Sequence, residues 1–540
     1  MLDRRLLTCL TASVIAGVGT VPGQQVPRAD QLKREAFAIV DANAERMGRI
    51  GDAIYSYSEI GFQEDKTVAL LAKTLTSAGF EVQTGVAGMP TAYVAKYGSG
   101  APVLGLMADY DCVPNASQQP AVVVHSPMVE GAPGHGEGHN TNPPTIIGAA
   151  LAVKALKDKY NLPGTILVFG GPAEEIVASR GYMVNAGLFR GVDAMMDAHV
   201  GSGLGTSYGL NNLAILSVQW RFRGIQGHGA SAWTGRSALD AVEILDIMLN
   251  FMREHLEPEA RMHYVITDGG KQPNVIPADA TVWYYFRHTD AQKLQGLFER
   301  AQRAAQAAAL ATDTKVTERI ISGSWPFNGN KALAELVDKN VQLVGMPKWS
   351  PEDQTFARHF QKSMDAPITG LKTEVDPLRS QRQGSSSSDA GDVTWQAPYI
   401  RLSMPSNVAG ALGGHHWSAA IGPATPMAHK GIAAGSKVLA ASLIDLMVDS
   451  RAVSTIKADF AKQLAAYPLW KSLIPADAAP PTFLNVEEMA RYRGALQRFE
   501  YDPESTQTYL EFLGITYPPA EPEAGAGKRS NQVSQEEGGR

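Results

Sequence analysis

The sequence predicts an α/β protein with a smaller α+β unit inserted into it. Three apolar strands, 103–107, 164–170 and 193–199, alternate with helical segments, and each leads into acidic or histidine residues. Ligands collect at the carboxyl ends of strands in open α/β sheets, so we expect a site there. From about residue 211 the order changes to β-α-β-β-α, which predicts a compact unit with one antiparallel sheet.

The remaining elements follow from periodicity and from glycine and proline boundaries. In the first part, we expect helices at 31–60, 64–80, 145–160 and 181–187 and short strands at 80–84 and 91–97. In the inserted unit, we expect strands at 213–223, 261–267 and 281–288 and helices at 237–256 and 290–311. A polar, serine-rich loop at 381–388 precedes a helix at 424–448.

These elements divide the chain into six segments. The expected boundaries are a signal peptide at 1–23, a main α/β domain in two parts at 31–210 and 326–450, an inserted unit at 211–325, a helical C-terminal extension at 451–517 and a tail at 518–540. The tail is rich in Pro, Gly, Glu and Ser, so we expect it to be disordered.

Length and composition fit a soluble protein of at least two domains. The chain has 540 residues, which exceeds what one hydrophobic core usually covers. Hydrophobic residues make up 44% and charged residues 19% of the chain. The formal net charge is −6 and no dense basic patch occurs, which argues against nucleic acid or an anionic membrane as a partner.

The N-terminal segment Met1–Gly23 is typical of a secretory signal. Arg4 and Arg5 precede an apolar run from Leu6 to Val21. This run of about 16 residues is shorter than the roughly 20 that a membrane span needs. We expect a periplasmic or secreted protein with no membrane contact beyond the signal; an uncleaved anchor is the alternative. Removal of the signal would leave Cys112 as the only cysteine, so no intrachain disulfide could form.

Three stretches combine histidine or carboxylate side chains with Gly, Pro and small residues: Gly134–Asn140, Pro172–Glu175 and Asp197–His199. This mixture of imidazole nitrogen and carboxylate oxygen suits zinc or manganese. The paired Glu174 and Glu175 point to different sides, so one can bind metal while the other takes a proton from water. The alternative is a surface pair of glutamates. The sequence therefore favours a metal-dependent hydrolase.

Two further motifs leave alternatives open. His415 and His416 lie in a glycine-rich loop and are candidates for a late ligand, with a core or surface role nearly as well supported. Gly205–Gly209 matches the G-x-S-x-G motif of serine hydrolases. That motif requires a strand, a sharp turn and a helix, whereas a strand-like run at 213–222 follows it here. A serine hydrolase with Ser207 as nucleophile is therefore a minor alternative.

Taken together, these motifs resemble the aminoacylase/carboxypeptidase-G type of metallopeptidase, and within it the aminobenzoyl-glutamate hydrolase-like amidohydrolases. The resemblance extends from about 31 to 448 and depends on many blocks in one order. These blocks are 108–111, 134–140, 172–175, 182–187, 193–199, 227–230, 235–241, 273–277, 283–287 and 389–393.

The resemblance implies a zinc-exopeptidase-like catalytic domain, with a mixed sheet flanked by helices and two divalent metal ions, Zn or Mn. It also implies that the inserted unit is a ferredoxin-like domain that mediates dimerisation, so the protein would be a homodimer or a higher homo-oligomer. The substrate would be a small molecule with a free carboxylate. The reaction would be cleavage of the amide bond in N-acyl or N-aroyl amino acids or dipeptides. A non-catalytic metal-binding homologue is the alternative.

The resemblance also assigns roles to individual residues. Glu174 would be the general base, and Asp111 would support a ligand from behind. The metal ligands would be Glu137, His139, Glu175, His199 and His415. His228 would reach the partner subunit's site and stabilise the oxyanion. Asn274 and Arg287 would hold the substrate's carboxylate. Glu137 replaces the Cys usual in this branch, which removes thiolate softness and leaves the choice between zinc and manganese open.

Overall fold

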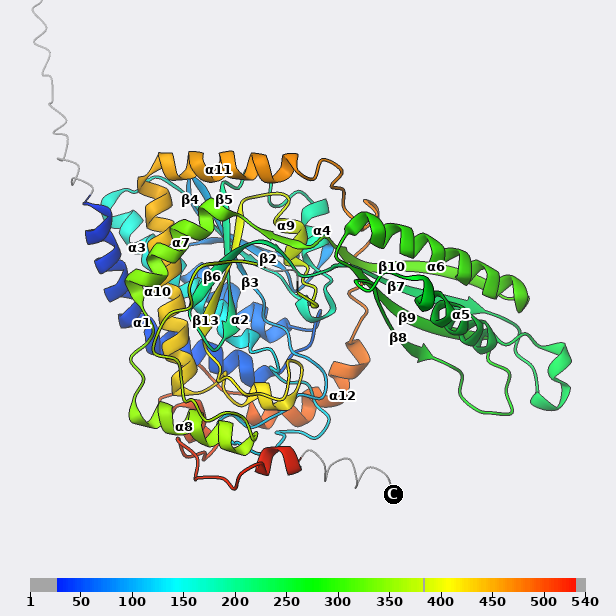
Figure 1. Ribbon diagram of the computed structural model, residues 1–540. Helices are drawn as coiled ribbons and strands as arrows, with labels where there is room; N and C mark the ends of the chain where they lie inside the picture. Colours follow the sequence, from blue (N-terminus) through cyan, green and yellow to red (C-terminus); the bar gives the residue numbers. More distant parts are fainter. Residues whose placement is uncertain (1–26, 382–383, 531–540) are drawn as a thin grey trace, which may run out of the picture.

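The computed structural model describes residues 27–381 and 384–530 and contains two sheets. A nine-stranded mixed sheet forms the body of the molecule, and a four-stranded sheet belongs to a unit that projects from it (Figure 1). The expected signal peptide, Met1–Gly23, lies outside the described residues.

The first part of the chain forms most of the body. Its elements are α1 (Ala29–Tyr57), α2 (Asp65–Ser77), β1 (Glu81–Thr84), β2 (Tyr93–Ser99), β3 (Val103–Ala108), α3 (Asn142–Tyr160), β4 (Gly164–Gly170), α4 (Arg180–Asn185), β5 (Ala194–Gly201) and β6 (Gly205–Asn211). Short 3₁₀ helices η2 (His139–Thr141) and η3 (Glu174–Ile176) lie in the loops. The apolar runs of the sequence thus become the buried strands β3, β4 and β5.

The chain returns to the body after the inserted unit. The returning elements are β11 (Phe327–Gly329), α7 (Lys331–Val344), α8 (Pro351–Ser363), β12 (Arg379–Ser380), α9 (Ala390–Val393), β13 (Tyr399–Pro405) and α10 (Pro426–Val448). The sheet order is β1-β2-β4-β3-β5-β13-β6-β11, with β12 paired to β6. The central strands β4, β3, β5 and β13 are parallel. Their carboxyl ends therefore meet at one edge, where ligands collect in such sheets.

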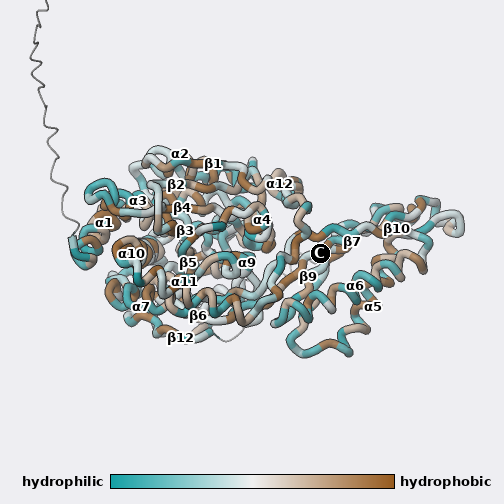
Figure 2. Tube along the Cα trace, turned by 90° about the horizontal axis from the view of Figure 1, so that it is seen from above, coloured by the Kyte–Doolittle hydropathy of each residue, from teal (hydrophilic) through white to brown (hydrophobic). Residues whose placement is uncertain are grey.

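Helices cover both faces of this sheet. Buried residues of α1, α3 and α10 pack together with one face, and residues of α4 and α9 contribute to the cluster on the other face. Figure 2 shows the hydrophobic residues following the strands through the middle of the body. In the described chain, α10 is the one helix long and apolar enough to span a membrane, but 78% of its apolar window is buried inside the protein. Packing in the core accounts for its composition.

The inserted unit has the order β-α-β-β-α-β. Its elements are β7 (Ala214–Arg223), α5 (Ala238–Met252), β8 (Arg261–Asp268), β9 (Asp279–His288), α6 (Ala291–Ala311) and β10 (Lys315–Ser324). The strands pair antiparallel in the order β10-β7-β9-β8. This element order is that of a ferredoxin-like unit. Strand β10 was not predicted from the sequence, because the first half of this edge strand is exposed and polar and lacks an apolar alternation.

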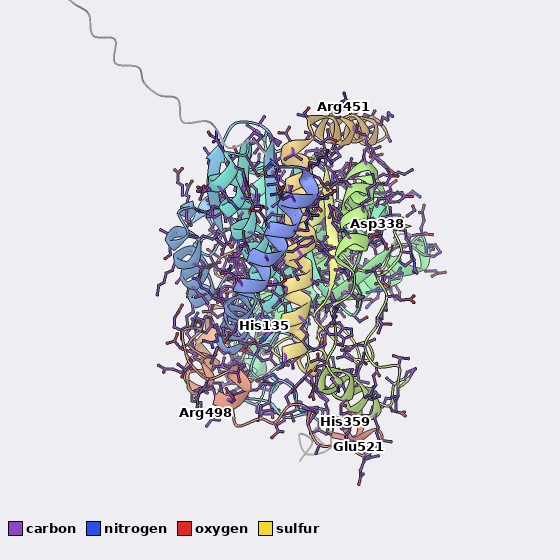
Figure 3. The ribbon with its side chains drawn as sticks, turned by 90° about the vertical axis from the view of Figure 1, so that its left-hand side faces the viewer. His135, Asp338, His359, Arg451, Arg498 and Glu521 are labelled. Carbon is purple, nitrogen blue, oxygen red and sulfur yellow. The ribbon has the colours of Figure 1, made fainter. Side chains whose placement is uncertain are left out.

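The C-terminal extension runs back over the body. It contains α11 (Ser450–Ala465), α12 (Val486–Leu496) and α13 (Tyr509–Phe512). Residues 518–530, part of the tail expected to be disordered, lie instead against α8. His359 Nδ1 is 3.0 Å from Pro519 O, and Gly527 N donates to Ser363 Oγ at 3.0 Å. Figure 3 shows His359 and Glu521 at the same end of the molecule.

The residue just before the tail, Tyr517, adds an aromatic anchor to these contacts. Tyr517 packs near Phe356 with ring centroids 5.2 Å apart, and its hydroxyl donates to Asp353 Oδ1 at 3.0 Å. Composition averages over the segment and therefore does not register a single aromatic anchor. Residues 531–540 lie outside the described part.

Candidate active site

The predicted site residues from the body meet at the carboxyl edge of the large sheet. Asp109 and Asp111 follow β3, Glu174 and Glu175 form η3 after β4, and His199 lies near the end of β5. Asp111, His139 and Glu174 are buried. Gly134 permits the loop before His139 to approach closely, since a Cβ there would lie 2.2 Å from Ala116 O.

Two histidines face each other at the centre of this cluster. His139 Nε2 lies 3.3 Å from His199 Nε2. Each ring has an acceptor at its other nitrogen: Asp111 Oδ1 is 3.3 Å from His139 Nδ1, and Val200 O is 3.2 Å from His199 Nδ1. Hydrogens on both Nδ1 atoms satisfy these acceptors, so the neutral rings direct two Nε2 lone pairs at each other. A shared cation or proton is needed to hold them together.

The electrostatics of His139 and His199 support the same conclusion. Burial alone would lower the pKa of His139, but Glu175, Asp111 and Glu174 outweigh it and raise that pKa to about 10. Burial, with the nearby Arg401, lowers the pKa of His199 well below its usual value. The carboxylates thus create a potential that attracts positive charge at His139, whereas His199 stays neutral and keeps its Nε2 lone pair. The same potential favours a divalent cation.

Glu175 and Asp111 extend the donor set. Glu175 Oε1 lies 3.6 Å from His139 Nδ1 and is a buried oxygen without a hydrogen-bond partner. Asp111 Oδ2 accepts from the Glu175 backbone N at 3.0 Å while Oδ1 faces His139. Asp111 therefore holds two ligand candidates in place from behind, which is how metal-binding histidines are usually oriented. The donor chemistry of the cluster fits a zinc or manganese ion.

Glu137 and His415 complete the cluster from two glycine-rich loops. His415 Nε2 lies 2.9 Å from Glu175 Oε2 and 3.4 Å from Glu137 Oε1. A Cβ at Gly414 would lie 2.4 Å from Glu137 Oε1, so this glycine admits the carboxylate. The structure places His415 here, whereas His416 Nδ1 accepts from Ser418 N at 3.2 Å. His415 has φ +62°, a strained backbone conformation of the kind that occurs at functional sites.

Glu174 is buried and precedes the candidate ligand Glu175 in the short helix η3. Its Oε1 accepts from Ser388 Oγ at 2.7 Å. Burial, helped by Asp389 and Glu175, raises the pKa of Glu174 to about 8 although His139 acts in the opposite direction. A carboxylate with a pKa near neutrality is suited to accept and return a proton.

Two arginines, the buried Arg180 and the half-buried Arg401, support the cluster, and neither was predicted from the sequence. Arg180 pairs with Asp109 and Asp389. Arg401 Nε donates to Asp197 Oδ2 at 2.8 Å. Arg401 had a usable signal, because it interrupts the apolar strand β13, whereas Arg180 lies in a short helix and looks like a surface residue. Both stabilise acidic side chains that would otherwise repel one another.

Asp109 also was not among the predicted ligands. Its carboxylate lies with His139 and His199 in a group of candidate ligand atoms within 4.8 Å of one another. Asp109 is already paired with Arg180, whose positive charge opposes a metal ion at the same carboxylate. We therefore assign Asp109 a supporting position. The Asp-x-Asp pattern at 109–111 was the signal that could have identified it.

The structure does not bring His228 and Asn274 to this cluster. Both are exposed residues of the inserted unit, where Gly229 N donates to Asn274 O at 2.8 Å. Arg287 is half-buried on β9, with its guanidinium 5.6 Å from the Tyr285 ring. In the described part of the chain, no hydrogen bond or ion pair joins these three residues to the predicted metal ligands.

Ser207 does not form a nucleophile elbow. It lies inside strand β6, which continues toward β7 and not into a helix. Ser207 Oγ accepts a hydrogen bond from Gln381 Nε2. The structure therefore lacks the strand–turn–helix geometry that the G-x-S-x-G motif requires.

Several known proteins are similar to this chain in sequence. Residues 105–416 match the sequence model of Peptidase family M20/M25/M40. The chain is 33% identical to one of the p-aminobenzoyl-glutamate hydrolase subunits of Escherichia coli (strain K12) over 439 residues, which are 76% of this chain and 91% of that protein. It is 30% identical to the Xaa-Arg dipeptidase of Mus musculus, covering 58% of this chain and 72% of that protein.

A solved structure shows the same fold. The aminobenzoyl-glutamate utilization protein from Klebsiella pneumoniae superposes with a TM-score of 0.52 at 17% identity, covering 78% of this chain and 98% of that chain. The family match spans more than half of the 540 residues and includes every ligand candidate of the cluster. The chain belongs to peptidase family M20/M25/M40 and is a hydrolase.

Proposed function

We propose that this protein is a metal-dependent amidohydrolase that cleaves N-acyl or N-aroyl amino acids or dipeptides. The observation that carries the proposal is the close approach of the Nε2 atoms of His139 and His199, 3.3 Å apart among buried carboxylates that include Glu174. The names of the relatives, an aminobenzoyl-glutamate hydrolase and a dipeptidase, support amide substrates that contain an amino acid.

Five residues would hold two divalent metal ions, Zn or Mn: Glu137, His139, Glu175, His199 and His415. When bound, such ions polarise the scissile carbonyl and lower the pKa of water. The carboxylates at Glu137 and Glu175 suit either metal, because the site lacks the thiolate that would favour zinc.

Glu174 would act as the general base and then as the acid. Its carboxylate takes a proton from the attacking water, and the same proton passes to the nitrogen of the leaving amine as the C–N bond breaks. Ser388 fixes the carboxylate by donating to Oε1 at 2.7 Å. The second oxygen therefore remains for the water.

The inserted unit would contribute to substrate binding and assembly. Arg287 would bind the substrate's free carboxylate in its own subunit's site. Asn274 and His228 lie next to each other and would act together in the partner subunit's site, Asn274 on the carboxylate and His228 on the oxyanion. The exposure of His228, remote from its own cluster, supports this arrangement. Strand β8 is an exposed sheet edge with Val265 57% exposed, and unpaired edges of this kind pair with other chains. We infer a homodimer or a higher homo-oligomer.

We also propose a periplasmic or secreted location. Arg4 and Arg5 before the apolar run Leu6–Val21 support it. Comparison of the mature N-terminus in exported and cytoplasmic fractions tests it.

Hydrolysis of a panel of N-acyl and N-aroyl amino acids by metal-loaded protein tests the function. We expect turnover that a chelator abolishes and that added Zn or Mn restores. Glu174→Gln should keep its metal content, measured by elemental analysis, and lose turnover. Metal binding with no turnover on any substrate would favour the non-catalytic homologue instead, and chelator-resistant turnover would contradict the metal mechanism.

A further inference from the structure

A cavity of about 790 Å³ lies beside the cluster of candidate metal ligands and is lined by residues of β5, β6, β12 and β13. His199, one of the candidate metal ligands, and Arg401 are among its lining residues. Strand β6 and its parallel neighbour β12 line the cavity side by side, with Arg379 in register with Ser207. Because His199 borders both the cavity and the other candidate ligands, a substrate group attached to the scissile carbonyl can enter the cavity.

The charged residues that line this cavity are mainly cationic. Among its lining residues in the described chain are Lys372, Arg379 and Arg401, against one acidic residue, Asp376. Lys372 Nζ lies 2.7 Å from Asp376 Oδ1, so these two charges compensate each other. Arg401 is bound to Asp197. Arg379 is exposed, and the described part of the chain records no ion pair for it.

The neutral lining of the cavity is also polar. Ser207, Gln381, Asn212 and Ser386 present hydroxyl and amide groups. Some of these groups bind one another: Gln381 donates to Ser207, and Asn212 Nδ2 donates to Ser386 Oγ at 2.7 Å. A plain aliphatic group would desolvate these groups without replacing their hydrogen bonds with water, which is unfavourable. The lining thus favours an occupant that carries charge and hydrogen-bond acceptors.

The position of the cavity identifies which half of the substrate enters it. Tyr285 and Arg287 are two residues apart on β9 and therefore lie on one face of that strand. The Tyr285 hydroxyl donates to Ile176 O at 3.4 Å, directly after Glu174 and Glu175. Arg287 therefore shares the strand face that contacts the Glu174 loop, whereas the cavity is lined by His199 and not by Glu174. If Arg287 binds the amino-acid carboxylate, the acyl group points into the cavity.

We propose that this cavity is the acyl subsite and selects acyl groups that end in a carboxylate, with Arg379 as the specificity-determining residue. The inference rests on the proposed amidohydrolase function for the orientation of the substrate. The substrates are then N-acyl amino acids with a second carboxylate on the acyl chain, as in an N-succinyl amino acid. Ser207 has a place here as part of the subsite wall and not as a nucleophile.

The test compares two substrates that differ only in one charge: an N-succinyl amino acid and its neutral analogue, the N-succinamoyl amino acid. We expect kcat/KM to favour the succinyl substrate by about tenfold, the scale of one charged hydrogen bond. Arg379→Gln should reduce this ratio to near unity, and Arg379→Glu should invert it. Arg190→Gln, at an exposed arginine outside the cavity, is the matched control and should leave both rates unchanged.

Binding separates failure of this inference from failure of the proposed function. Calorimetry with metal-loaded Glu174→Gln protein measures the affinity for both compounds without turnover. Tighter binding of the succinyl compound, lost on adding Arg379→Gln and weakened between about 20 mM and about 500 mM salt, supports the inference even if no substrate is hydrolysed. Equal affinity for the two compounds, or an equal loss of both in Arg379→Gln, would overturn it.

Discussion

Arginines occur both around the cluster of candidate metal ligands (the inner cluster) and in the cavity beside it (the outer cavity). The two sets differ in whether an acidic side chain compensates their charge. Arg180 is fully buried between Asp109 and Asp389, and Arg401 is bound to Asp197. Arg379, in the outer cavity, is exposed and has no ion pair in the described chain. A buried charge is costly unless it is paired, whereas an exposed one remains solvated and free to bind a ligand.

This difference separates structural charges from recognition charges. Removal of an inner partner leaves another charge buried and uncompensated, so the whole site should suffer whatever the substrate. Replacement of an outer charge should change the preference among substrates and leave the fold intact. The following experiments test this contrast.

The largest effect is expected for Glu174→Gln. The amide keeps the shape of the side chain but cannot take the proton from water, so kcat should fall by about 100-fold or more on every substrate. Steady-state kinetics on succinyl and succinamoyl substrates checks this. An unchanged ratio between the two substrates is part of the prediction, and a loss confined to one of them would contradict it.

Arg180→Met should destabilise the protein by about 3–5 kcal/mol, the cost of breaking a buried ion pair by removing one partner. Asp109 and Asp389 would both lose their cation. Urea unfolding in the presence of a chelator measures this without a contribution from metal. Arg379→Met is the matched outer variant, and its unfolding midpoint should remain that of the parent protein.

Asp392 tests what happens to a buried carboxyl group for which the described chain shows no ion pair with an arginine or lysine. Burial raises the pKa of Asp392 to about 7, although its Oδ1 accepts from Trp325 N at 2.8 Å. The folded pKa lies above the unfolded value of about 4, so this group's contribution to stability is complete below about pH 4 and is lost as the pH rises through about 7.

Asp392→Asn should therefore raise the Tm of the metal-free protein at about pH 8 and leave it nearly unchanged at about pH 4. Thermal unfolding followed by circular dichroism at both pH values measures the difference. Asp389→Asn, which removes a partner of Arg180, should lower Tm at about pH 8. A gain in both variants would show that pairing does not matter at this site.

The smallest effect is expected for Ser207→Ala. A subsite hydroxyl that accepts from Gln381 contributes about one hydrogen bond, so kcat/KM should fall by less than about tenfold. Loss of a nucleophile would instead cost at least about a thousandfold. The same kinetic assay distinguishes the two outcomes.

Much of the fold and of the cluster follows from local sequence. The apolar runs at β3, β4 and β5 predict buried strands, and the glycine-rich loops mark where His139 and His415 approach other groups. What local sequence does not contain is the identity of distant partners. Arg180 and Asp389 are 209 residues apart, and nothing near either one indicates that they meet. The first half of β10 is exposed, so it shows no apolar periodicity.

The place of β13 in the sheet has a consequence for biosynthesis. This strand lies between β5 and β6, yet it is synthesised after the whole inserted unit. A chain emerging from the ribosome can complete the inserted unit while β5 still has an open edge, because its neighbour does not yet exist. His415 follows β13 and therefore joins Glu175 only after the sheet has closed. On the proposed ligand set, a nascent chain has no complete hydrolytic centre until roughly the last quarter of its synthesis, and a premature stop before β13 would yield a protein that lacks His415.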